Sequence, residues 1–61
     1  MPLDNYQKVE QMLYASTEIQ TISVKREGDE LHVTYMLGDV DLGITFTAYE
    51  VDRIAQNYAG Q

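Results

Sequence analysis

The chain has 61 residues, with ten Asp or Glu against four Lys or Arg, so its formal net charge at pH 7 is -6. That length allows one domain with a thin core, and we treat residues 1–61 as a single acidic domain. So few cations, together with the negative net charge, argue against direct nucleic-acid binding and against binding to an anionic membrane surface. The sequence has no cysteine, which excludes disulfides and Cys-based zinc or iron–sulfur sites.

The N-terminal residues and the apolar runs indicate a location. The chain begins at Met1 and has Asp4 where the basic region of a signal peptide would lie. No apolar run approaches the roughly 20 residues of a transmembrane helix. We therefore expect a soluble, cytoplasmic protein.

The first predicted element is a helix over residues 5–15. Asp4 lies at the N-cap position, and Gln7 follows three residues later, where the partner of a capping box belongs. Val9 and Leu13 fall on one apolar stripe, together with Tyr6. The helix is therefore expected to bury this stripe.

Three strands are predicted next, the first over residues 19–26. Two-residue hairpin loops at Gly28-Asp29 and Gly38-Asp39 separate the strands, because Gly accepts positive φ without steric cost. Both loops place the same residues of the middle strand on the apolar face, so the two registers agree. The expected pairs are Arg26–Leu31, Val24–Val33 and Ile22–Tyr35, then Leu37–Val40, Tyr35–Leu42, Val33–Ile44 and Leu31–Phe46.

The last predicted element is a helix from residue 48 to about residue 58. Thr47 and Glu50 form a capping box, and Phe46 can pack on Val51 as a hydrophobic staple. Gly60 lies where this helix is expected to end.

These elements predict an α+β fold, a helix followed by a three-stranded antiparallel meander and a second helix (αβββα), with both helices on one face. Three strands make a sheet roughly 14 Å wide. Two helices side by side need close to 20 Å. Two chains that join their sheets edge to edge, or helices that pack across a dimer, would relieve this mismatch, so a homodimer is favoured over a monomer. The edge of the first strand is the expected contact, because Thr21 faces outward and 20–23 contains no charge or proline.

The candidates for chemistry are few. His32 is the only histidine, and the predicted register places it on the outer sheet face between Lys25 and Thr45. Asp41 shares that face but lies toward the opposite end. A catalytic base needs a nucleophile and an orienting partner within reach, so we assign no catalytic, metal-binding or cofactor-binding residue and expect no enzyme activity.

Two exposed groups are candidates for protein binding. Tyr49 lies opposite the apolar stripe of the last helix, with Arg53 one turn on, and both residue types are enriched at interface hot spots. The alternative is a cation–π pair on a solvated helix face. Met36, beside Gly43 on the outer sheet face, is a second candidate contact.

Acidic residues are expected to gather at both ends of the sheet. Glu27, Asp29 and Glu30 form one group at the first hairpin, with Glu50 nearby, and we add them to the protein-binding candidates. The second group is Glu18, Asp39 and Asp41. The simpler interpretation is that these are solvated turn acids, and the alternative is that they bind a basic partner.

The sequence favours a non-catalytic regulator or adaptor that binds another protein. In its sharpest form the hypothesis is an acidic inhibitor that occupies a basic site on a nucleic-acid-handling protein. Two alternatives remain open. One is a small enzyme or ligand carrier whose site lies at a subunit interface and uses His32 and Asp41. The other is a structural subunit that adds the edge of its first strand to a partner sheet.

Overall fold

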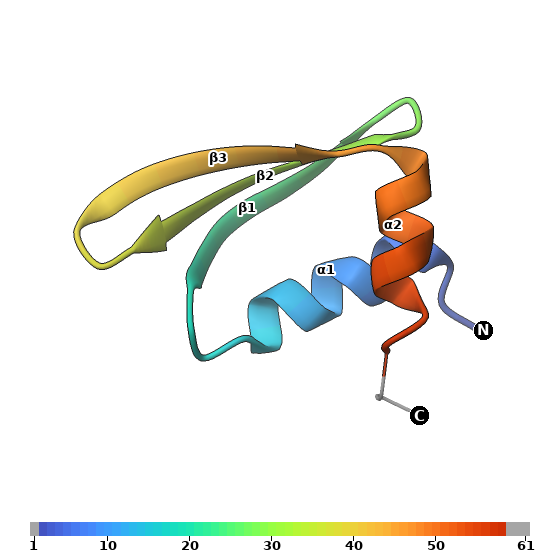
Figure 1. Cartoon of the computed structure of the whole chain (residues 1–61), viewed down its shortest axis with the longest axis horizontal. Helices are drawn as coiled ribbons and strands as arrows, with labels where there is room; N and C mark the ends of the chain where they lie inside the picture. The colour runs from blue at the N-terminus through green and yellow to red at the C-terminus, as the bar shows by residue number, and fades with distance from the viewer. Residues whose placement is uncertain (1, 59–61) are drawn as a thin grey trace.

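Residues 2–58, which the computed structural model describes, form two helices and a three-stranded antiparallel sheet. Both helices lie on one side of the sheet, which we call its inner face (Figure 1). The predicted αβββα fold is therefore confirmed. In chain order the elements are α1 (Asn5–Ala15), β1 (Gln20–Glu27), β2 (Glu30–Leu37), β3 (Val40–Phe46) and α2 (Ala48–Ala55).

Both predicted capping boxes are present. The Gln7 N–H donates to the Asp4 carboxylate over 2.8 Å, and the Asp4 N–H donates to the Gln7 side chain over 3.0 Å. At α2 the Thr47 N–H donates to Glu50 over 2.9 Å, and the Glu50 N–H donates to the Thr47 hydroxyl over 3.3 Å. Each box satisfies backbone donors that the first turn of a helix leaves unpaired.

Helix α2 ends at Ala55, earlier than the sequence predicts. The Asn57 N–H donates to the Ile54 carbonyl, and the Tyr58 N–H donates to the Ala55 carbonyl, both over 3.0 Å. These bonds span three residues and tighten the chain out of the α-helical path. The predicted stop at Gly60 lies outside the described residues.

The strands are joined in the order β1-β2-β3. Gly28 and Gly38 begin the two hairpin turns with φ of 63° and 66°, as the predicted loops require. All predicted pairs between β2 and β3 are confirmed, including Val33 opposite Ile44 and Leu37 opposite Val40.

The register between β1 and β2 differs from the prediction at one place. Val24 lies opposite Val33 as expected, but Thr21, not Ile22, lies opposite Tyr35, because a bulge interrupts the ladder between Thr21 and Ser23. Thr21 therefore does not point outward: its hydroxyl donates to the Leu13 carbonyl in the last turn of α1 over 3.0 Å. The bulge gives this hydroxyl a partner and leaves Ile22 48% exposed.

Replacing Thr21 by Val is expected to lower the free energy of unfolding by about 1 kcal/mol, because the part-buried hydrogen bond to Leu13 is lost without a change in side-chain shape. Denaturant unfolding measures the change. Thr34→Val is the matched control, since Thr34 is an exposed residue of β2. Equal effects at the two positions would contradict the role assigned to the Thr21 hydroxyl.

The core lies where both helices meet the middle of β2. Val9 of α1 and Val51 of α2 are fully buried, and Leu31 and Val33 of β2 are 2% exposed. Ala55 completes this cluster, and Phe46 packs against it, as the predicted staple requires. One compact cluster therefore holds both helices and the sheet together.

The helices do not lie side by side beneath the sheet, as the width argument assumed. They cross each other at one end of the molecule, and the β2–β3 hairpin projects beyond them (Figure 1). The eight residues of α2 make a helix about 12 Å long, whereas the seven residues of β3 extend about 23 Å. The sheet is thus too long for its helices, and part of its inner face has no cover.

Candidate functional site: an open apolar sheet face

The uncovered part of the inner face carries large apolar side chains. Because successive residues of a strand alternate between faces, they share the face of buried Leu31 and Val33. Their exposed fractions range from 37% to 55%. We call this surface the open face, and its residues are Leu37, Val40, Leu42 and Ile44.

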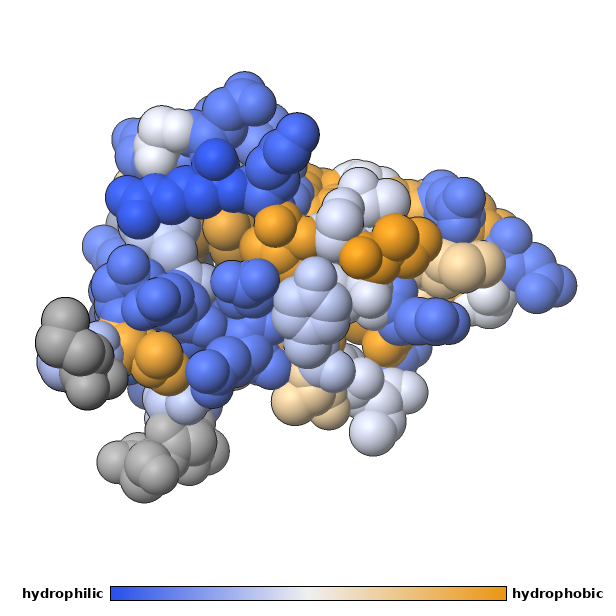
Figure 2. Space-filling view, turned by 180° about the vertical axis from the view of Figure 1, so that it is seen from behind, coloured by the Kyte–Doolittle hydropathy of each residue, from blue (hydrophilic) through white to orange (hydrophobic). Residues whose placement is uncertain are grey.

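An apolar cavity of about 190 Å³ continues the open face toward the core. Its walls come from the end of α1, the segment before β1, and the inner faces of β2 and β3. In Figure 2 apolar side chains reach the surface in a band that runs from the middle of the molecule toward its narrow end. The lining residues are Leu13, Ile19, Val33, Tyr35, Ile44 and Phe46.

The open face exists because the apolar alternation of β3 extends further than helix α2 can cover. The inward positions of β3 are apolar along the whole strand, from Val40 to Phe46. Only Phe46 lies near α2 and packs on the core. A strand end that simply faced water would carry polar residues at these inward positions. The other three inward positions of β3, Val40, Leu42 and Ile44, therefore form an apolar surface that the described residues leave exposed.

The structure keeps the two candidates for chemistry apart. His32 lies between Lys25 and Thr45, as predicted, and Asp41 lies opposite Met36 toward the other end. The His32 Nδ1 is 3.1 Å from the Thr45 hydroxyl.

The other ring nitrogen of His32, Nε2, lies near two carboxylates and not near Asp41. It is 3.5 Å from Glu30 and 3.9 Å from Glu27. These four side chains form a polar network on the outer face of the sheet, and the cavity described above lies on the other face. Among residues 2–58, no group of three or more His, Asp or Glu is arranged to hold a metal ion.

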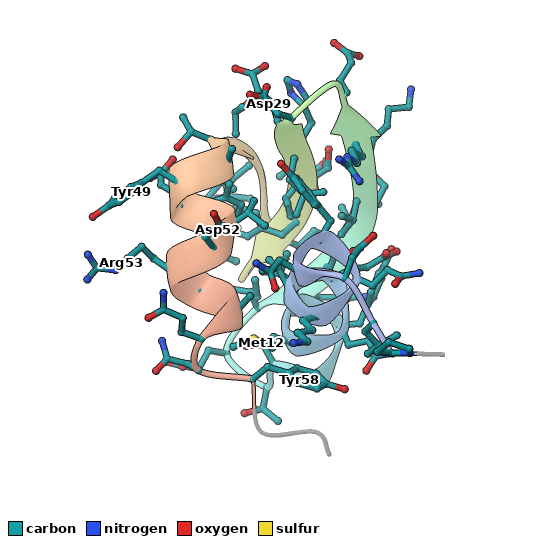
Figure 3. The ribbon with its side chains drawn as sticks, turned by 90° about the vertical axis from the view of Figure 1, so that its right-hand side faces the viewer. Met12, Asp29, Tyr49, Asp52, Arg53 and Tyr58 are labelled. Atoms are coloured by element: carbon teal, nitrogen blue, oxygen red, sulfur yellow. The ribbon has the colours of Figure 1, made fainter. Side chains whose placement is uncertain are left out.

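Tyr49 and Arg53 point away from the body of the molecule on α2 (Figure 3). The Arg53 guanidinium donates to the Tyr49 hydroxyl over 2.8 Å and lies 5.7 Å from the ring centroid. This contact is the cation–π pair on a helix face that the sequence offered as the alternative. Asp52, in contrast, faces α1, where Asn5 donates to its carboxylate over 2.9 Å.

The other predicted binding residues are divided between the two ends of the sheet. Met36 is half-buried on the outer face, opposite Gln20 and Asp41, and so does not belong to the open face. Glu50 is engaged in the capping box of α2.

The first hairpin holds Glu27, Asp29 and Glu30 together, as predicted, and it is tied to α1. The Tyr6 hydroxyl donates to the Asp29 carbonyl over 2.7 Å. Glu27 and Glu30 also lie 3.9 Å and 3.5 Å from the His32 ring. This end of the molecule is therefore held by internal contacts.

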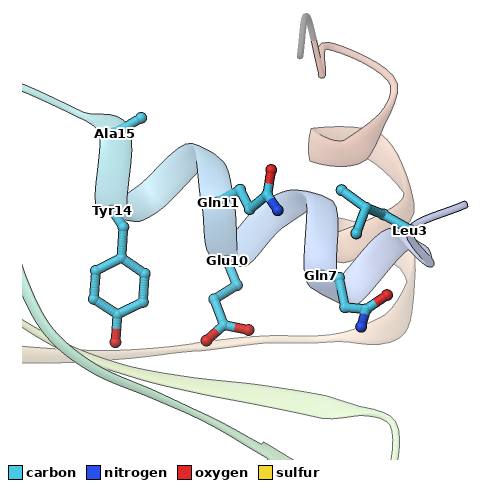
Figure 4. Close-up of a pocket in the computed structure, with 6 residues that line it drawn as sticks. All are labelled: Leu3, Gln7, Glu10, Gln11, Tyr14 and Ala15. Atoms are coloured by element: carbon cyan, nitrogen blue, oxygen red, sulfur yellow. The ribbon is translucent and has the colours of Figure 1, made fainter. Parts of the chain in front are cut away.

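A second hollow runs along the solvent side of α1 (Figure 4). Five of its six lining residues come from this one helix, and their side chains are mostly polar. The hollow is a shallow strip of helix surface without groups that converge on one point, so we assign it no role. Its residues are Leu3, Gln7, Glu10, Gln11, Tyr14 and Ala15.

None of the helices within residues 2–58 is long and apolar enough to cross a bilayer. Sequence reasoning placed Leu42 and Ile44 on the inner face but did not identify them as exposed. A comparison of the length of the last helix with that of the third strand could have shown that the helix is too short to cover these residues. Comparison with models of protein families, with curated proteins and with solved structures finds no match to this chain, so its function is argued from its own residues.

Proposed function

We propose that this protein is a non-catalytic regulator or adaptor that binds another protein through the open face. The observation that carries the proposal is the exposure of Leu37, Val40, Leu42 and Ile44 on one face, next to an apolar cavity. On globular proteins, a contiguous exposed apolar patch that is rimmed by polar residues marks an interaction site.

The total exposed surface agrees with an uncovered sheet end. The chain exposes 4511 Å². A folded monomer of its mass, 7.0 kDa, is expected to expose about 4,000 Å². The chain therefore exposes somewhat more surface than a compact monomer of its mass, which accords with a hairpin that extends beyond its helices.

The acidic clusters give weaker support to an inhibitor that imitates nucleic-acid charge. Such a protein needs carboxylates that are free and spaced along one face. Here Glu50 caps a helix, and Glu27 and Glu30 approach His32. Tyr49 and Arg53 also give weaker support to a binding surface, because Arg53 already donates a hydrogen bond to the Tyr49 hydroxyl. The open face has no such internal partner among the described residues.

The enzyme alternative would use His32 on the outer face. Its neighbours are Thr45, Glu30 and Glu27, and not Asp41. A reaction at this network would proceed on an open sheet surface, without the enclosed, water-excluding pocket that small-molecule sites have. The open face therefore supports binding better than this network supports catalysis.

Site-specific photo-crosslinking tests which surface binds. A photo-reactive amino acid at Leu42 is expected to give a discrete protein adduct in lysate of the source organism, because this side chain would lie within an interface. The same amino acid at Thr34, which is exposed in β2, is the matched control and should give none. Adducts at Tyr49 but not at Leu42 would move the binding surface to α2 and contradict the proposal.

A further inference from the structure

The charges of the molecule are distributed unevenly between its two ends. Residues 9–24 and 33–46, which include the C-terminal part of α1, the start of β1 and the whole of β3, contain neither Lys nor Arg. They contain Glu10, Glu18 and two Asp residues at the tip of the projecting hairpin, Asp39 and Asp41.

The four cations lie at the other end, beside α2 and the first hairpin. Arg26 lies 3.8 Å from the centroid of the Tyr6 ring, and Lys8 lies 6.0 Å from that of Tyr58. Arg53 lies against Tyr49. Lys25 is placed opposite His32 near the end of β1. At the tip end of the molecule the described residues thus carry acids and no Lys or Arg. Asp39 lies in the turn between Leu37 and Val40 of the open face, and Glu18 precedes Ile19, which lines the cavity. Asp41 lies on the outer face of β3.

We propose that the partner presents a basic amphipathic helix to the open face, an inference that rests on the proposed function. The apolar stripe of such a helix would cover Leu42 and Ile44 and their neighbours, and its Lys or Arg residues would lie near Glu18 and Asp39. Asp41, on the outer face of β3, would add to the negative potential at this end. Complementary charge around an apolar centre is the arrangement that gives an interface its specificity and its association rate.

The space beneath the hairpin suits a helix. α1 lies beneath one side of the sheet and α2 crosses at one end, so the inner face of β2 and β3 toward the tip lacks a packing layer (Figure 1). A sheet with one apolar face is normally covered on that face by a layer of helices or by a second sheet. A partner helix would complete this layer by laying its apolar side chains into a groove.

A second copy of the chain fits this surface less well. Two copies that joined open faces would bring Glu18, Asp39 and Asp41 of both together with no Lys or Arg between them. The homodimer through the edge of β1 remains a prediction. The bulge beside Ile22 disfavours it, since bulges twist an edge away from regular pairing.

The test uses two designed helical peptides that differ only in charge. Each has about 15 residues, the length that matches the hairpin, with leucine in one helical stripe. One peptide carries lysine at its polar positions and the other carries glutamate. Methyl NMR of the labelled protein follows binding, with Leu42 and Ile44 as reporters. We expect the lysine peptide to shift these methyl signals and to bind at least about tenfold more tightly than the glutamate peptide.

Two charge-matched variants separate a specific site from general attraction between opposite charges. Glu18→Gln combined with Asp39→Asn and Asp41→Asn removes three charges at the tip end of the molecule, where the open face lies. This variant should bind the lysine peptide about fivefold more weakly, because it loses three exposed charges whose attraction to lysine contributes a few tenths of a kcal/mol each. Glu27→Gln with Asp29→Asn and Glu30→Gln removes three charges at the opposite end and should change binding little.

Each other outcome overturns a defined part of the argument. If both peptides shift the open-face signals with equal affinity, the basic partner is wrong while the proposed function survives. If both triple variants weaken binding equally, the attraction is non-specific and the basic partner is again wrong. If neither peptide shifts Leu42 or Ile44, the open face does not accept a helix and the basic helix is wrong, while crosslinking at Leu42 still decides the proposed function. A dimer in sedimentation, together with concentration-dependent shifts of the Leu42 and Ile44 methyl signals, would replace the basic helix by a second copy.

Discussion

The Val51→Asp variant is expected to be unfolded in water at 25 °C. Val51 is fully buried between α1 and the sheet, and the residues around it in the core are apolar. A carboxylate placed there without a partner costs several kcal/mol, whether it stays charged or takes up a proton. A domain this small rarely has more than about 3–5 kcal/mol of stability to lose. The substitution therefore removes most or all of it.

Circular dichroism and guanidinium unfolding measure this outcome. Tyr49→Asp is the matched control, because it places the same residue in the same helix at a position that is 67% exposed. That position lies in the first turn of α2, where a negative charge interacts favourably with the helix dipole, so the control should fold. A cooperative unfolding transition for Val51→Asp would show that Val51 is not in the core that the structure describes.

Much of the fold could be predicted because local patterns and long-range pairing agree in this sequence. The apolar stripe that includes Val9, and the alternation of Leu31 and Val33, select the residues that are buried in the structure. Gly28 and Gly38 fixed the hairpin loops, and the loops fixed the register between β2 and β3. These features depend on neighbours in the sequence, where periodicity is informative.

The bulge in β1 could not be predicted from the same patterns. Alternation favours Ile22 as the inward residue, because isoleucine is apolar and Thr21 is polar. The structure turns Thr21 inward because its hydroxyl reaches the Leu13 carbonyl, and that contact depends on how α1 lies against β1. A hydrogen bond between a helix and a strand, such as this one, cannot be read from the periodicity of either element.

The exposure of the open face could not be predicted from the sequence for a related reason. Alternation identifies the face on which Leu42 and Ile44 lie, but it does not say whether another element extends far enough to cover them. The sequence predicts Tyr49 and Arg53 as binding residues because they lie opposite the apolar stripe and are of types enriched at interface hot spots, but the structure pairs them with each other. The open face continues its pattern without interruption, so only the lengths and the crossing of the helices reveal that it is exposed.

Replacing Val40 and Leu42 together by Thr is expected to weaken partner binding about thirtyfold, with the lysine peptide or the crosslinked protein as the ligand. Each side chain would bury its exposed part on binding, which contributes about 1 kcal/mol to the binding free energy. The two together contribute about 2 kcal/mol, which corresponds to a roughly thirtyfold change in Kd. Calorimetric titration measures it. The free energy of unfolding should change by less than about 1 kcal/mol, because Thr keeps a high strand propensity and both positions are exposed.

Ile22→Thr is the control that makes this result specific. Ile22 is 48% exposed, much as the open-face residues are, but it lies in β1 at the bulge and not among the residues that line the cavity. It should bind the partner as tightly as the unmodified chain does. If it weakens binding as much as the double variant, exposed apolar area anywhere on this protein is sufficient. The uncovered end of the hairpin would then be a consequence of short helices and not a binding surface.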